Sequence, residues 1–192
     1  MSAFHLIFRI LIVSGLASNS LASEAPKKVN EAFRHTFMSC SLITSEHLTA
    51  LQLYQRGLPL DAALKELPNI SDDAKKRLRY LYDMVKLNGI LNTYSDINTN
   101  YARCAKLVHD VNGKPEPALR EYGYYFCSGE NKIRFEILLL LDAGKTSAEI
   151  MKYIPDSHFH VLNQYQKLIK DKGTLAAFDF TANNLKACLS RL

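Results

Sequence analysis

Two segments that run from a glycine to a proline recur in this sequence at one distance from a cysteine. The first, residues 57–68, begins 17 residues after Cys40, and the second, residues 144–155, begins 17 residues after Cys127. A spacing that returns unchanged is typical of a repeated structural unit. The sequence therefore predicts two copies of one cysteine-bracketed unit, arranged in tandem.

The first 22 residues have the pattern of a secretory signal peptide. Arg9 is their single Lys or Arg and precedes an apolar run over residues 10–17, and small side chains at Ser20 and Ala22 suit cleavage after Ala22. The alternative, a membrane anchor, needs about 20 apolar residues to cross a bilayer. We therefore expect a periplasmic or secreted protein without a membrane anchor.

The four cysteines follow this leader, and an even number in an exported chain predicts two disulfides. Each copy of the unit should carry its own bridge, so the repeat favours Cys40–Cys104 and Cys127–Cys188. A bridge that closes a loop of this size stabilises a fold by up to about 4 kcal/mol. A zinc site is a weaker alternative, because the sequence contains no C-x-x-C pair.

Apolar residues recur at three- and four-residue spacing along most of the chain, which predicts helices and not strands. In the first copy a long helix is expected from about Asn30 until Gly57, which occupies the position of a left-handed C-cap. A short helix should then end at Pro68, and a third helix should begin at Ser71. Residues 90–95 are ambiguous, and a last helix follows them.

Each copy thus has four helical segments: long, short, long and long. If their directions alternate, the start of the first helix and the end of the fourth lie at the same end of the unit, where two cysteines can meet. The predicted fold class is all-α, with two tandem four-segment units that are each closed by a disulfide. The predicted organisation is a signal peptide at 1–22, a first helical unit at 23–112, a linker at 113–121 and a second helical unit at 122–192.

Residue types that carry out catalysis or bind metals form no familiar motif. The sequence has no H-E-x-x-H, G-x-S-x-G or P-loop pattern. His158 and His160 are two residues apart, so on a helix they point to different faces. We expect both histidines to be exposed on an amphipathic helix, and we expect no metal and no cofactor.

A pair of carboxylates could support glycoside cleavage. The candidates are Glu46, Asp61, Glu130 and Glu136, but nothing in the sequence singles out two of them. Bridged cysteines would also leave no thiol nucleophile. The sequence therefore favours a protein without catalytic residues, and a small envelope hydrolase stays as an alternative.

Tyr122, Tyr124, Tyr125 and Phe126 place four aromatic side chains within five residues. They cannot all point inward on one helix, so one or two should be exposed, and exposed tyrosines are favoured in protein interfaces. Two interpretations stay open. The stretch either seals the joint between the two units or contacts a protein partner.

The chain carries 24 Lys and Arg against 19 Asp and Glu, and these charges are spread along its length. A nucleic-acid partner would need a more concentrated cationic face, so we expect none. The general plan is similar to that of small helical, disulfide-bridged periplasmic immunity proteins. That similarity implies a soluble binding protein of a bacterial envelope, such as an inhibitor or immunity protein against a periplasm-acting toxin or cell-wall hydrolase. A structural or assembly factor, whose two units each bind one copy of a partner, is a further alternative.

Overall fold

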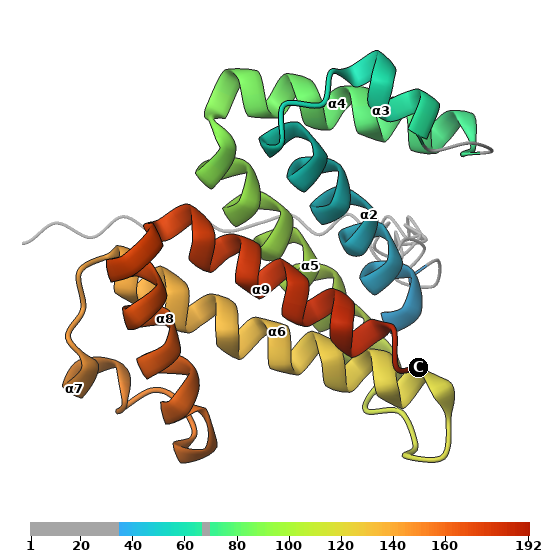
Figure 1. The fold of residues 1–192 in the computed structure, drawn as a ribbon. Coiled ribbons are helices and arrows are strands. Elements are labelled where there is room, and N and C mark those ends of the chain that lie inside the picture. The colour runs from blue at the N-terminus through green and yellow to red at the C-terminus, as the bar shows by residue number, and fades with distance from the viewer. Residues whose placement is uncertain (1–34, 67–69) are drawn as a thin grey trace, which may run out of the picture.

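The computed structural model describes residues 35–66 and 70–192, and most of these residues are helical (Figure 1). In chain order the elements are α2 (Phe37–Gln55), α3 (Leu60–Glu66), α4 (Asp72–Asn88), α5 (Ile90–Asn112), α6 (Arg120–Asp142), α7 (Ser147–Ile150), the 3-10 turn η1 (Asp156–His158), α8 (Phe159–Lys172) and α9 (Thr174–Leu189). The two described ranges contain no strand, so the all-α prediction is confirmed. The predicted signal peptide lies outside them.

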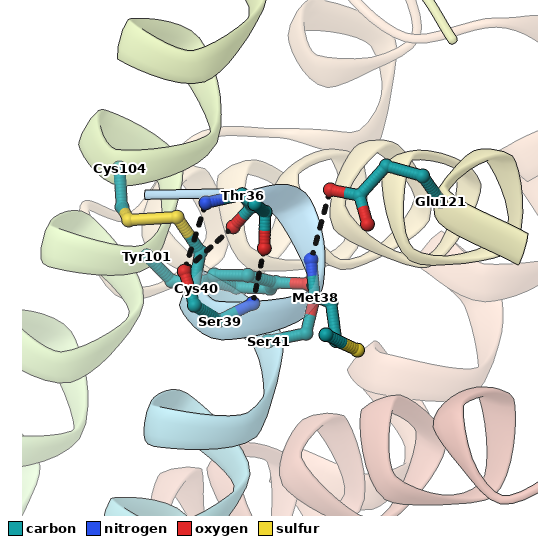
Figure 2. Close-up of a disulfide and its surroundings, with 8 residues drawn as sticks. All are labelled: Thr36, Met38, Ser39, Cys40, Ser41, Tyr101, Cys104 and Glu121. Carbon is teal, nitrogen blue, oxygen red and sulfur yellow. Dashed lines mark hydrogen bonds between the residues drawn. A yellow bond between two sulfur atoms is a disulfide. The ribbon is translucent and has the colours of Figure 1, made fainter. Parts of the chain in front are cut away.

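Helix α2 begins later than the sequence pattern suggested. The backbone N–H of Ser39 donates to Thr36 Oγ1 at 3.0 Å, and the N–H of Thr36 donates to Ser39 Oγ at 2.9 Å. This reciprocal cap fixes the first helical residue at Phe37 (Figure 2). The prediction of one helix from about Asn30 is therefore wrong, because His35 and Thr36 are not helical. Residues 30–34 are outside the described ranges.

Other helix ends follow the local signals closely. Gly57 comes after α2 with a φ of +79°, the left-handed conformation that favours glycine. Ser71 caps α4 by accepting from the N–H of Ala74, and Thr146 and Glu149 form a capping box at α7. The ambiguous residues 90–95 are helical and belong to α5.

Both predicted disulfides are present. Cys40 on α2 bridges Cys104 on α5, and Cys127 on α6 bridges Cys188 on α9, each with a Cα–Cα distance of 5.9 Å. Ser41 and Tyr101 lie beside the first bridge (Figure 2). Their hydroxyl groups share a hydrogen bond of 2.7 Å. Each disulfide joins the first and the fourth α-helix of one half.

The two halves have corresponding elements in the same order, α2 to α5 and α6 to α9. The correspondence is not uniform, since a seven-residue α3 stands where the second half has the four-residue α7 and the turn η1. The origin of the halves as copies of one unit stays a prediction. Buried apolar side chains from Phe37 to Leu185 form a single core that both halves share.

Polar contacts also connect the halves. The backbone N–H of Met38, at the start of α2, donates to Glu121 Oε1 on α6 at 3.2 Å (Figure 2). The side-chain amide of Asn131 on α6 donates to Asn98 Oδ1 on α5 at 2.9 Å in a buried position. Within residues 35–66 and 70–192, none of the helices combines the length and the apolarity that crossing a bilayer requires.

Candidate functional site

A groove of about 430 Å³ lies between α5 and α6, where the two halves meet. Its lining positions recur every three or four residues on both helices, so each helix turns one face toward the groove. On α5 they extend from Thr99 to His109, about 15 Å at 1.5 Å per residue, and on α6 from Tyr125 to Leu139, about 21 Å. We call this feature the α5–α6 groove.

The walls of the α5–α6 groove are mainly apolar. Large side chains come from Phe37 on α2 and from Tyr125, Phe135 and Leu139 on α6. Small residues such as Gly129 and Ala102 on the two walls leave the space between these large side chains open. An apolar cavity of this size is typical of a binding site.

The charged residues that line the groove are mostly cationic. Arg103, Lys106 and Lys132 line it, against one carboxylate, Glu136. Lys132 Nζ lies 2.8 Å from Glu136 Oε1, and Lys106 Nζ lies 2.6 Å from Asp110 Oδ2. Both lysine pairs are largely exposed to water, where such pairs contribute about 0–1 kcal/mol and exchange partners readily. Arg103 is exposed and has no acidic partner among the described residues.

Tyr125 closes one end of the groove. Its ring stacks on His109 of α5 at a centroid distance of 6.0 Å and meets the ring of Phe37 edge to face at 5.2 Å. Offset and edge-to-face arrangements are the favoured geometries of aromatic pairs. Tyr125 therefore joins the two halves and contributes to the groove wall at the same time.

The four aromatic residues of the predicted interface lie in different environments and do not form one patch. Tyr124 is buried in the core, and Tyr122 is half-buried with Lys114 Nζ 5.5 Å from its ring centre. Phe126 is 53% exposed and lines a separate cavity beside the Cys127–Cys188 bridge. Of the four, Tyr125 alone lines the α5–α6 groove.

Each disulfide borders a cavity, of about 370 Å³ in the first half and about 190 Å³ in the second. Equivalent helix positions line both cavities: Cys40, Ile43 and His47 in the first half and Cys127, Glu130 and Arg134 in the second. Their chemistry differs, because charged and amide side chains make up half of the lining of the second cavity and a smaller share of the first. The halves thus present dissimilar concave faces, which counts against an assembly factor that binds two copies of one partner.

His35 lies beside the first disulfide. A ring nitrogen of His35 and the sulfurs of Cys40 and Cys104 are all within 4.8 Å of one another. Metal ligation by cysteine requires a thiolate, and both sulfurs are in the disulfide. His35 alone therefore remains as a ligand in this cluster.

His47 borders the cavity beside that disulfide. Burial lowers the pKa of its imidazole, although the neighbouring carboxylate of Glu46 acts in the opposite direction. Its Nε2 atom is buried and has no hydrogen-bond partner among the described residues. Glu46 is instead bound to Arg77 by two hydrogen bonds, of 2.8 and 3.1 Å. His47 is therefore neutral near pH 7 and is not assisted by a carboxylate hydrogen bond.

The expectation that His158 is exposed is wrong. It is 7% exposed and belongs to the turn η1, which directs its ring inward. Its Nε2 lies 3.3 Å from Glu130 Oε2 on α6, and its Nδ1 lies 3.0 Å from Ser157 Oγ. His160 is exposed, as expected. No sequence pattern indicated this burial, because Glu130 is 28 residues away on another helix.

The four candidate acids are not brought together. Glu46, Glu130 and Glu136 each form an ion pair with a different Arg or Lys, and each lines a different cavity. Asp61 is exposed on α3. This arrangement does not support a hydrolase that uses two of these four carboxylates.

Comparisons with known protein families, curated proteins and solved structures find no match. The function is therefore inferred from this chain's own residues. Sequence reasoning missed the α5–α6 groove, since periodicity predicts helices but not which helices lie next to each other. The available signal was the pairing of a small residue with a cation on α5, at Ala102-Arg103 and again at Ala105-Lys106.

Proposed function

We propose that this protein is an exported, non-catalytic binding protein that holds a segment of a partner protein in the α5–α6 groove. The observation that carries this proposal is the apolar trough between two helices, with cations on both of its edges. Burial of apolar surface supplies most of the binding free energy. Charges at fixed positions make binding specific for a partner of complementary charge. The groove lies where the two halves meet, so it depends on the complete fold.

Export is supported by the signal-peptide pattern of residues 1–22 and by the two disulfides, which are compatible with an extracellular or periplasmic location. The absence of catalytic residues is supported by the separation of the candidate acids. The most specific form of the proposal is an inhibitor or immunity protein that binds a toxin or cell-wall hydrolase acting in the periplasm. In that form of the proposal, binding of the partner in the groove is what inhibits the partner.

Gly129 allows the groove to be blocked without disturbing the fold. A Cβ atom added at this position has no neighbour within 4 Å, and the residue lines the groove from the interior of α6. Gly129→Trp would fill the groove with an indole ring. Gly129→Ala is the matched control, because it leaves the groove open and favours the helix by up to about 1 kcal/mol.

The test begins with a photo-crosslinking amino acid in place of Thr99, which lines the groove on α5. A protein captured from an envelope extract is identified, purified and titrated against the wild type and both Gly129 variants. We expect the wild type and Gly129→Ala to bind alike and Gly129→Trp to bind at least about tenfold more weakly, equivalent to about 1.4 kcal/mol. Equal binding by Gly129→Trp, or no captured partner even at low salt, would contradict the proposal. If the partner is a hydrolase, its inhibition should follow the same order.

A further inference from the structure

We propose that the segment bound in the α5–α6 groove is an amphipathic α-helix of the partner, with acidic side chains on both sides of its apolar stripe. This inference rests on the proposed function and names the chemistry of the bound segment. It is carried by three properties of the groove: its length, the small residues on its facing walls, and the placement of its cations.

The lined segments of α5 and α6 are about as long as the apolar stripe of a short docked helix. Its walls extend over about 15 Å of α5 and about 21 Å of α6. A helix that presents apolar side chains at positions i, i+4, i+7 and i+11 covers about 17 Å. Ala102 on one wall and Ser128 and Gly129 on the other allow such a helix to approach closely.

Cations come from both walls of the groove. His109 stacks on Tyr125 at one end, and Asn98 bonds to Asn131 farther along, so α5 and α6 run in opposite directions. Arg103 and Lys106 then lie one turn apart on the α5 edge, and Lys132 lies on the α6 edge. Acidic side chains that flank an apolar stripe on both sides would meet these cations.

A single-chain lipid anion fits this arrangement less well. A fatty acid has one carboxylate at one end, and it would leave cations on at least one edge of the groove without a partner. A helix with several acidic residues can pair with both edges. Arg103 is the first cation such a helix would engage, because no acidic side chain among the described residues competes for it.

Synthetic helical peptides of about 15 residues provide the probe. Two peptides share one leucine stripe and are stapled to equal helicity, and they carry either glutamate or lysine at the flanking positions. At low salt we expect the dissociation constant of the glutamate peptide to be at least about tenfold lower, since several exposed pairs each contribute a fraction of a kcal/mol. The preference should shrink at about 1 M salt, where the screening length falls to about 3 Å.

Two charge variants separate the groove from the overall charge of the chain. The double variant Arg103→Glu, Lys132→Glu should reverse the preference, whereas Arg79→Glu, at an exposed position on α4, should leave it unchanged. Gly129→Trp should weaken the binding of the glutamate peptide at least about tenfold. Circular dichroism confirms that each variant is folded before it is titrated.

The inference is overturned if both peptides bind alike, or if the lysine peptide binds better. It is also overturned if dodecanoate binds the wild type more tightly than the glutamate peptide does and no longer binds the Gly129→Trp variant. The groove would then select an acyl anion. A captured partner that enters the groove through a non-acidic or non-helical segment refutes this inference and leaves the proposed function standing. A captured partner that binds Gly129→Trp normally refutes the proposed function itself.

Discussion

The hydroxyl group of Tyr94 on α5 donates a hydrogen bond of 2.5 Å to Asp179 Oδ1 on α9, across the junction of the two halves. The Tyr94 side chain is fully buried. Its pKa is raised well above the usual range, first by burial and then by the carboxylate of Asp179, so the phenol stays protonated and donates. Gln52 and Gln55 of α2 donate to the same carboxylate at 3.0 and 3.2 Å. The Asp179 side chain on α9 therefore links its own helix to α5 and α2 by hydrogen bonds.

Removal of the Tyr94 hydroxyl should weaken this junction. Tyr94→Phe keeps the ring and deletes a donor to a half-buried carboxylate, and we expect the free energy of unfolding to fall by about 1–3 kcal/mol in urea titration. Tyr80→Phe, at a position that is 67% exposed, should change it by less than about 0.5 kcal/mol. Equal stability of Tyr94→Phe and the wild type would show that the bond contributes nothing.

A second buried tyrosine predicts a loss of stability at alkaline pH. Burial raises the pKa of Tyr101 to about 12, partly offset by its hydrogen bond to Ser41. The unfolded chain loses this proton near pH 10, so the stabilisation is complete below pH 10 and is lost as the pH rises through about 12. Between these values the free energy of unfolding of the wild type should fall faster than that of Tyr101→Phe, by up to about 1.4 kcal/mol per pH unit. Parallel curves would contradict the assignment.

Two glycine substitutions should have opposite signs. An added Cβ meets nothing within 4 Å at either Gly57 or Gly129, so space does not distinguish them. Gly57 has a φ of +79°, and Gly57→Ala should cost about 1 kcal/mol, whereas Gly129→Ala inside α6 should stabilise by up to about 1 kcal/mol. Thermal denaturation measures both. A shift in the same direction for the two variants would refute this conformational explanation.

The two disulfides should contribute comparably to stability, because they close loops of 64 and 61 residues. Replacing both cysteines of one bridge by serine should cost about 2–5 kcal/mol in either half. Urea titration of Cys40→Ser, Cys104→Ser and of Cys127→Ser, Cys188→Ser provides the comparison. If one variant failed to fold and the other was unaffected, loop length would not determine how much each disulfide contributes to stability.

Local chemistry made much of this fold predictable. Ser71 and Thr146 cap helices, and Gly57 follows the end of one. Each interacts only with residues close to it in the sequence, so its role could be predicted from the sequence. The disulfide pairing was predicted from the repeated spacing, because each copy was expected to carry its own bridge, and a count of four helical segments agreed with it. The start of α2 was misplaced because the Thr36 cap uses Ser39 and not the usual glutamate or glutamine.

The features that could not be predicted depend on contacts between side chains that are far apart in the sequence. Asp179 lies 85 residues from Tyr94, and Glu130 lies 28 residues before His158. No periodic pattern indicates that such side chains will meet, because their contact is decided by how the two halves pack. The α5–α6 groove has the same origin, since it exists where a helix of one half lies against a helix of the other.

The most direct measurement is hydroxyl-radical footprinting of side chains in the complex with the captured partner, compared with the free protein. We predict that Tyr125 and Leu139 of the α5–α6 groove become protected, while Tyr80 on α4 and the 78% exposed Tyr153 after α7 keep their reactivity. Protection of Tyr80 or Tyr153 with no change at Tyr125 and Leu139 would place the partner elsewhere and contradict the central claim.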